Sequence, residues 1–289
     1  IKIGVHIADV TYYLNKFPNL LQDASYQGST CCLPNNFIPM LPNDLIASKC
    51  NLEPDATRPA VSVVFTLTNG LITDTWIGRG IVKVSCRFSY GLAEKLINMS
   101  EETELESINC LNTKSISLEI CRVLREIEKI CEKVRTNRLN AFEVLNLPKF
   151  KFDFNSLIPK KINNLFDETH TPKSQSLIEE LMLMANIEVG KVLLKNFRKS
   201  SLIKVKSRSI LSEKQITSIK NNVSNIVDFP SKFDSFWNHV FSKFLSSSYY
   251  ARYIEEKYPP FALGMNKFTH FTSPTRRFSD IIVHFQLLH

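Results

Sequence analysis

The segment between residues 60 and 77 most constrains what this chain can fold into, because it has the pattern of a β-hairpin. Residues 60–68 (AVSVVFTLT) and 71–77 (LITDTWI) are rich in β-branched and aromatic side chains, and Asn69-Gly70 separates them. An Asn-Gly pair accepts positive φ at both central turn positions and joins antiparallel strands tightly. We expect strand character to continue from residue 78 toward 88, and the alternating apolar residues of 1–14 to add another strand.

The second half of the chain has helical periodicity instead. Residues 176–194 are apolar almost all round, which predicts a buried helix, and Ser176 with Glu179 would form its capping box. Helices and loops are expected over 212–254. Residues 116–138 place one apolar face at helical spacing: Ile120, Val123, Leu124, Ile127, Ile130 and Val134. A sheet-rich front and a helix-rich back predict an α+β or mixed α/β fold.

Composition limits the alternatives. No Gly/Ser/Pro-rich linker divides the chain, so residues 1–289 are expected to form one domain. No stretch approaches eighteen uncharged apolar residues, which argues against a membrane span. The start, Ile1-Lys2-Ile3, has neither an initiator Met nor the plan of a signal peptide, so we expect a piece of a longer protein. The 7 cysteines show no CxxC pair, which favours free thiols over disulfides or a zinc site.

The charge of the chain is unevenly distributed. Its 36 basic and 28 acidic side chains give a net charge of +8. Residues 191–220 carry a basic stripe that only Glu213 opposes: Lys191, Lys195, Arg198, Lys199, Lys204, Lys206, Arg208, Lys214 and Lys220. Such a stripe would attract a phosphate backbone through counterion release. A solvated, solubilising face is the other interpretation, and charge alone does not choose between them.

The most informative segment is 268–289 (FTHFTSPTRRFSDIIVHFQLLH). Ser273 and Pro274 predict a helix start, as N-cap and first helical residue. Arg276 and Arg277 would then lie in the first turn, where cations oppose the helix macrodipole. The later apolar residues recur at helical spacing and predict a buried face: Phe278, Ile281, Ile282, Phe285 and Leu288.

Two arginines in that place indicate that an anion binds there. Backbone N–H groups, the hydroxyls of Thr272 and Ser273 and two guanidinium groups would bind one or two phosphates. The alternative is that both arginines pair with buried carboxylates, and Asp280 is within reach of one of them. His270 and His284 flank the motif and either assist or have structural roles.

Five segments, in the order in which the family has them, resemble the RNB family of RNase II-type exoribonucleases. Residues 4–10 (GVHIADV) resemble its VHIADV signature, and 38–42 (IPMLP) its PMLP element. Residues 76–82 (WIGRGIV) are similar to the WxGR segment of its eukaryotic, exosome-related branch. Residues 178–186 (IEELMLMAN) resemble the EEFMLLAN helix, and 269–278 (THFTSPTRRF) closely resemble THFTSPIRRY.

The resemblance implies Mg²⁺-dependent hydrolysis of single-stranded RNA from its 3′ end, releasing nucleoside 5′-monophosphates. Arg276 matches an arginine needed for cleavage, which would bind the scissile phosphate. Tyr90 matches a tyrosine that stacks near the 3′-terminal base, although a core or rim aromatic is its other interpretation. Glu180 matches a carboxylate that helps to hold the terminal nucleotide, or it is a first-turn glutamate of its own helix. We expect His270, Thr272, Ser273 and Arg277 to contact RNA beside them.

The resemblance is incomplete at the metal site. The family binds two Mg²⁺ ions with an Asp followed by Asp-x-Asp-Asp, upstream of the VHIADV strand, and no such motif occurs in these residues. Asp9 cannot bind two metals alone, so we expect this chain not to cleave RNA by itself. Further departures from the family pattern are Gln27, Cys32, Pro260, Phe268 and Phe285.

These departures leave a second hypothesis open, a degenerate domain that acts as an RNA-binding regulator. Under either hypothesis the expected partner is single-stranded RNA, and an exosome-like complex is a further candidate. A monomer is expected, and the resemblance favours the cytoplasm over the nucleus.

Overall fold

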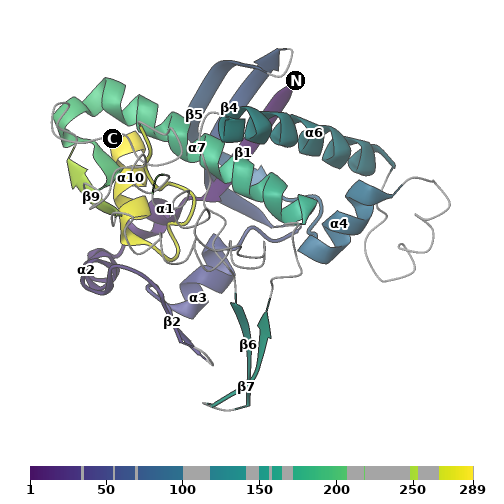
Figure 1. The fold of residues 1–289 in the computed structure, drawn as a ribbon. Helices are drawn as coiled ribbons and strands as arrows, with labels where there is room; N and C mark the ends of the chain where they lie inside the picture. The colour runs from purple at the N-terminus through teal and green to yellow at the C-terminus, as the bar shows by residue number, and fades with distance from the viewer. Residues whose placement is uncertain are drawn as a thin grey trace.

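The computed structural model describes residues 1–33, 36–54, 56–68, 71–99, 118–140, 150–155, 158–164, 172–206, 218, 248–252 and 267–288. It has the mixed α/β fold that the sequence predicts, with strands concentrated in the first half (Figure 1). The first half contains β1 (Lys2–Ala8), α1 (Val10–Leu14), α2 (Pro18–Gln27), β2 (Cys31–Cys32), β3 (Phe37–Ile38), α3 (Asn43–Leu45), the π-helical turn η1 (Ile46–Cys50), β4 (Thr57–Thr68), β5 (Leu71–Lys83) and α4 (Tyr90–Asn98). The elements that follow α4 are α6 (Leu118–Asn140), β6 (Phe150–Asn155), β7 (Ile158–Asn164), α7 (Lys173–Phe197), the 3₁₀ turn η3 (Arg198–Ser200), β8 (Leu202–Lys206), β9 (Ser248–Arg252) and α10 (Phe278–Leu288).

The predicted hairpin forms the centre of an antiparallel sheet with the order β1-β4-β5. Val63 of β4 lies opposite Val5 of β1 on one side and Ile77 of β5 on the other. The turn residues Asn69 and Gly70 lie outside the described residues. The expectation of a strand over 1–14 is wrong beyond Ala8, because the next residues form α1.

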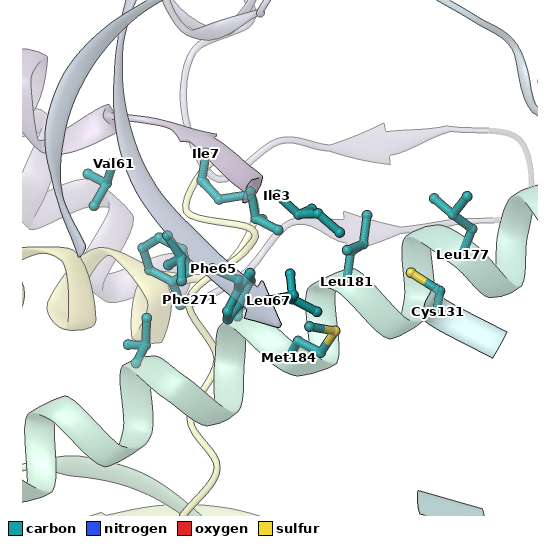
Figure 2. Packing of buried hydrophobic residues seen from close by; sticks show 14 of the residues in the cluster. Ile3, Ile7, Val61, Phe65, Leu67, Cys131, Leu177, Leu181, Met184 and Phe271 are labelled. Atoms are coloured by element: carbon teal, nitrogen blue, oxygen red, sulfur yellow. The ribbon is translucent and has the colours of Figure 1, made fainter. Parts of the chain in front are cut away.

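The core lies between this sheet and two long helices. Alternate residues of β1 point inward, so that Ile3, Val5 and Ile7 are buried while Lys2, Gly4 and His6 are not. Helices α6 and α7 cross the inward face of the sheet (Figure 1). Figure 2 shows side chains of α7 meeting those of β1 and β4. The labelled members of this core are Ile3, Ile7, Val61, Phe65, Leu67, Cys131, Leu177, Leu181, Met184 and Phe271.

Helix α7 confirms the predicted buried helix but begins earlier than expected. It starts at Lys173, and its N-cap is Pro172, whose side chain makes no capping hydrogen bond. The capping box of Ser176 and Glu179 is therefore wrong, since Ser176 already donates its backbone N–H to the carbonyl of Pro172 at 3.0 Å. The expectation of only helices and loops over 212–254 is also wrong at β9, which pairs with β8.

The C-terminal helix starts later than the sequence predicts. Helix α10 begins at Phe278, so Ser273 is not its N-cap and Arg276 and Arg277 precede it. Residues 273–277 form successive turns, in which the N–H groups of Arg276 and Arg277 donate to the Ser273 carbonyl at 3.2 and 3.1 Å. Ile281 of α10 packs in a second buried cluster with Val10, Leu14, Ala24, Met40, Leu41 and Cys50.

Among the described residues, no helix is long and apolar enough to cross a membrane. Cys31, Cys32, Cys50, Cys86, Cys121 and Cys131 are free thiols.

Candidate nucleic-acid interface

A buried carboxylate organises the segment that carries the two arginines. Asp280 is fully buried, and its Oδ2 accepts hydrogen bonds from the Ser273 backbone N–H at 2.8 Å and from Arg277 Nη2 at 2.8 Å. Its Oδ1 accepts from Arg277 Nε at 2.9 Å and from Ser279 Oγ at 3.1 Å. The bidentate pair with Arg277 fixes that guanidinium group in place. Of the two alternatives for Arg277, the structure shows pairing with a buried carboxylate.

Arg276 has a different environment. Its side chain is exposed, and in the part of the chain that the structure describes no carboxylate lies within ion-pair distance of it. Its backbone is held firmly, because its carbonyl accepts the Thr30 N–H at 3.0 Å. Nearby, Phe278 donates its N–H to the Gly28 carbonyl at 2.8 Å, and Gly28 has a φ of 71°, which favours glycine. Arg276 is therefore a cation with a fixed backbone and a side chain available to an anion.

His270 lies beside these arginines but is not a cation at neutral pH. Its Nδ1 is hydrogen bonded to the hydroxyl of Tyr250, which strand β9 supplies. Burial, together with the positive charges of Arg277 and Lys204, lowers the pKa of His270 to about 4. A neutral imidazole can contact RNA through a hydrogen bond but does not add to the positive charge.

Thr272 and Ser273 take part in the same segment as predicted, in a half-buried position. Thr269, just before them, donates its hydroxyl to the Leu202 carbonyl at 2.7 Å and so ties the segment to β8. Ser273 uses its backbone N–H for Asp280, so that donor is not available to a phosphate.

The second histidine of the motif is structural. His284 is fully buried, its Nε2 donates to the Phe271 carbonyl at 2.9 Å, and the two rings stack with centroids 4.6 Å apart. Burial lowers the pKa of His284, so it is neutral as well.

Glu180 lies on the buried side of α7, not in its first turn. Its side chain is 2% exposed, and both of its oxygens accept hydrogen bonds from Arg138 of α6, at 3.2 and 2.8 Å. A contact between Glu180 and a nucleotide would require this ion pair to open. The role of Glu180 in RNA binding stays a prediction, and its role in joining α6 to α7 is observed.

Tyr90 is placed where a base could reach it. It is the first residue of α4 and is 52% exposed, while Ser89 caps the helix by accepting the Leu92 N–H at 3.2 Å. Tyr90 is not in the same cluster as Arg276: helix α4, which carries Tyr90, lies at the start of α7, whereas α10, which follows Arg276, lies toward the other end of α7 (Figure 1). The structure thus brings His270, Thr272, Ser273, Arg276 and Arg277 together and leaves Tyr90 and Glu180 apart from them.

The described residues do not fit a two-metal site. They contain no group of three or more His, Cys, Asp or Glu side chains that could hold a metal ion. Asp9, the carboxylate of the VHIADV-like segment, is buried and engaged: Arg79 Nε donates to it at 2.6 Å and the Tyr12 N–H at 3.1 Å. Asp9 acts as the N-cap of α1 and the partner of Arg79.

The contacts that three residues make with this segment were not predicted from the sequence. Lys204 and Tyr250 come from paired strands far from the motif in sequence, and nothing local indicates that they approach His270. Asn186 of α7 accepts the Phe271 N–H at 2.9 Å and anchors the motif from behind. Asn186 is the last residue of the 178–186 segment (IEELMLMAN). The resemblance of that segment to the EEFMLLAN helix of the family could have drawn attention to Asn186.

Comparison with known proteins gives a consistent result. The sequence matches the RNB domain over residues 1–289. It is 30% identical to the DIS3-like exonuclease 2 of Caenorhabditis elegans, over 99% of this chain and 37% of that protein. It is 29% identical to a protein named inactive exonuclease DIS3L2 of Arabidopsis thaliana, over 98% of this chain and 29% of that protein.

Solved structures show the same fold. RNase R of Mycoplasma genitalium, in complex with ribose methylated single-stranded RNA, superposes with a TM-score of 0.76 at 23% identity, covering 99% of this chain and 45% of that one. The chain spans between 29% and 37% of the length of the first curated relatives that it matches.

Proposed function

The chain belongs to the RNB domain family, and on that premise we propose that it binds single-stranded RNA and acts in hydrolysing it from the 3′ end, releasing nucleoside 5′-monophosphates. The observation that carries this proposal is the pair of arginines in the 273–280 segment. Arg277 is neutralised by Asp280, whereas Arg276 is exposed on a rigid backbone beside it. Arg277 stabilises the 273–277 turns through its ion pair with Asp280. Arg276 presents its guanidinium group to a phosphate.

Single-stranded RNA fits the remaining features. Lys191, Lys195 and Arg198 of the basic stripe are exposed, although residues 207–217 and 219–220 of that stripe lie outside the described residues. Tyr90 offers an exposed ring for a base, and stacking on aromatic rings is tolerant of sequence. The C. elegans relative is named an exonuclease, and the Mycoplasma genitalium RNase R structure contains a ribose methylated single-stranded RNA; both support a nucleic-acid substrate.

The Mg²⁺ ions that the family implies would have to be held by residues other than the described ones. A domain that binds RNA without cleaving it is the second candidate, because a relative at 29% identity is named an inactive exonuclease. From the same resemblance we also propose that the protein is a monomer, that it is located in the cytoplasm and that an exosome-like assembly is a partner.

The test uses a 5′-labelled single-stranded RNA and the full-length protein, not residues 1–289 alone, with and without Arg276→Ala. With Mg²⁺, a working enzyme shortens the RNA stepwise from the 3′ end, and EDTA stops it. Arg276→Ala should abolish cleavage and leave RNA affinity within a few-fold, because it removes stabilisation that forms mainly in the transition state.

Arg122→Ala is the matched control, since Arg122 is an exposed arginine on α6, away from the motif. Binding without cleavage by the unaltered protein would assign it to the second candidate. A large loss of affinity in Arg276→Ala with normal turnover of the RNA that binds would refute the role given to Arg276.

A further inference from the structure

The helix that carries Tyr90 is attached to the start of α7 by one carboxylate. Glu94 lies one turn after Tyr90 on α4, and its Oε2 accepts the backbone N–H of Ser174 at 2.8 Å. Its Oε1 accepts from Asn98 Nδ2 at 3.0 Å, so both oxygens are engaged. Partial burial by itself would raise the pKa of Glu94, but the hydrogen bonds from Ser174 and Asn98 outweigh it and lower the pKa, so the carboxylate is charged at neutral pH.

The hydrogen bond from the Ser174 N–H to Glu94 replaces an N-terminal cap that α7 does not supply from its own residues. The first N–H groups of a helix have no partner within the helix, and they lie at the positive end of its dipole. Pro172, the N-cap of α7, offers no side-chain acceptor, and Ser174 is 3% exposed, so water cannot satisfy its N–H. Glu94 provides the missing acceptor and a negative charge from another element.

Other contacts make α4 a rigid carrier for Tyr90. Leu96 and Met99, at its far end, pack against Cys121 of α6 in a separate buried cluster. Arg125 of α6 donates from Nη1 to the Met99 carbonyl at 3.3 Å. Because Tyr90 and Glu94 are four residues apart, they lie on the same side of the helix. A shift of Glu94 would therefore move Tyr90.

The middle of α7 holds the segment that leads to Arg276. Asn186 binds the Phe271 N–H, and Gly190 lies so close to the Lys267 carbonyl that an added Cβ would be 2.2 Å from its oxygen. Between Ser174 and Asn186 the helix extends about 18 Å at 1.5 Å per residue. Figure 1 shows α4 at the start of α7 and α10 toward its other end.

We propose that Glu94 is a positioning residue, which fixes the ring of Tyr90 at a set distance from Arg276 by docking α4 onto the N-terminus of α7. For the bound RNA, this means that the 3′-terminal base stacks on Tyr90 only while Glu94 accepts the Ser174 N–H. The inference rests on the proposed function, since it assumes that single-stranded RNA is bound.

The experiment measures fluorescence of 2-aminopurine placed at the 3′-terminal position of a short single-stranded RNA, in EDTA so that no cleavage occurs. Binding to the unaltered protein should quench the terminal probe more than the same probe placed internally. Tyr90→Ala should remove the extra quenching and weaken binding of the short RNA about 5- to 150-fold, the range expected for loss of one base–aromatic stack.

Glu94→Ala should reproduce both effects although Tyr90 is intact. Glu94→Gln should retain most of the quenching, because its amide oxygen can still accept the Ser174 N–H. Ser174→Pro removes the same hydrogen bond from the α7 side, in the first turn where proline is tolerated, and should behave like Glu94→Ala. Glu179→Ala is the matched control, since it removes an exposed carboxylate of α7.

The double variant Tyr90→Ala/Glu94→Ala separates positioning from general stability. If Glu94 acts through Tyr90, the double variant binds no more weakly than Tyr90→Ala alone. Additive losses, or a folded Glu94→Ala protein with normal terminal quenching, would overturn the proposal. Absence of any RNA binding by the unaltered protein would instead overturn the proposed function, and this inference with it.

Discussion

Replacing Asp280 with Ala should be among the most destabilising substitutions in the C-terminal segment. The change removes the acceptor of four hydrogen bonds and leaves the Arg277 guanidinium group without its partner. Breaking one side of a buried ion pair costs about 3–5 kcal/mol. Since the Arg277 side chain is 23% exposed and water can reach it, we expect about 3 kcal/mol, the lower end of that range.

Asp280→Asn tests the source of this energy. The amide keeps the size of the side chain and one acceptor but removes the charge, so its cost should be about 1–2 kcal/mol. Both values come from urea unfolding, as the change in midpoint at unchanged m-value.

The control for this prediction is an ion pair on the surface. Glu126 and Lys129 of α6 pair at 2.9 Å, but their side chains are 59% and 68% exposed. Glu126→Ala should therefore cost no more than about 1 kcal/mol. If Asp280→Ala costs no more than Glu126→Ala, the 273–277 turns are held by something other than Asp280, and the reasoning about Arg276 loses its support.

Two further predictions concern the same region. Gly190→Ala should destabilise the protein by roughly 1–3 kcal/mol in urea unfolding, because its Cβ would collide with the Lys267 carbonyl; an unchanged midpoint would show that α7 and residue 267 do not touch. The unfolded chain protonates His270 near pH 6.5, whereas the folded protein resists protonation until about pH 4 because of burial and of the nearby Arg277 and Lys204. Stability should therefore fall as the pH drops from about 6.5 toward 4, and His270→Gln should flatten this part of the pH profile; an equally steep profile in the variant would refute it.

The sheet and the long helices could be predicted because their signals are local. The alternation in β4 and β5 places Val63 and Ile77 on the same face without knowledge of the rest of the chain. The apolar face of α6 and the apolar character of α7 likewise follow from spacing alone.

The errors arose where contacts distant in sequence decide a local structure. Ser273 and Pro274 have the form of a helix start, but Asp280 binds the Ser273 N–H and keeps the following residues in turns. Ser176 and Glu179 have the form of a capping box, but α7 extends back to Lys173, where Glu94 caps it from another helix, 80 residues away in sequence. Asp280 was a candidate partner for one of the arginines, but Glu94 could not be assigned its partner from its own neighbourhood.

The candidate site divides in the same way. The motif places His270, Thr272, Ser273, Arg276 and Arg277 in one stretch of sequence, and their role in binding RNA stays a prediction. It could not predict which arginine is neutralised, because that depends on the packing of Asp280. The ion pair of Glu180 was hidden for the same reason, since Arg138 lies 42 residues earlier.

The attachment of α7 at its start and at its middle restricts which insertions and deletions this chain can accept. One residue added between Ser174 and Asn186 would rotate everything after it by about 100° and advance it by about 1.5 Å. Either the Ser174 N–H would turn away from Glu94 or the Asn186 side chain would turn away from Phe271. The number of residues in this stretch of helix is therefore fixed by the two elements that it connects.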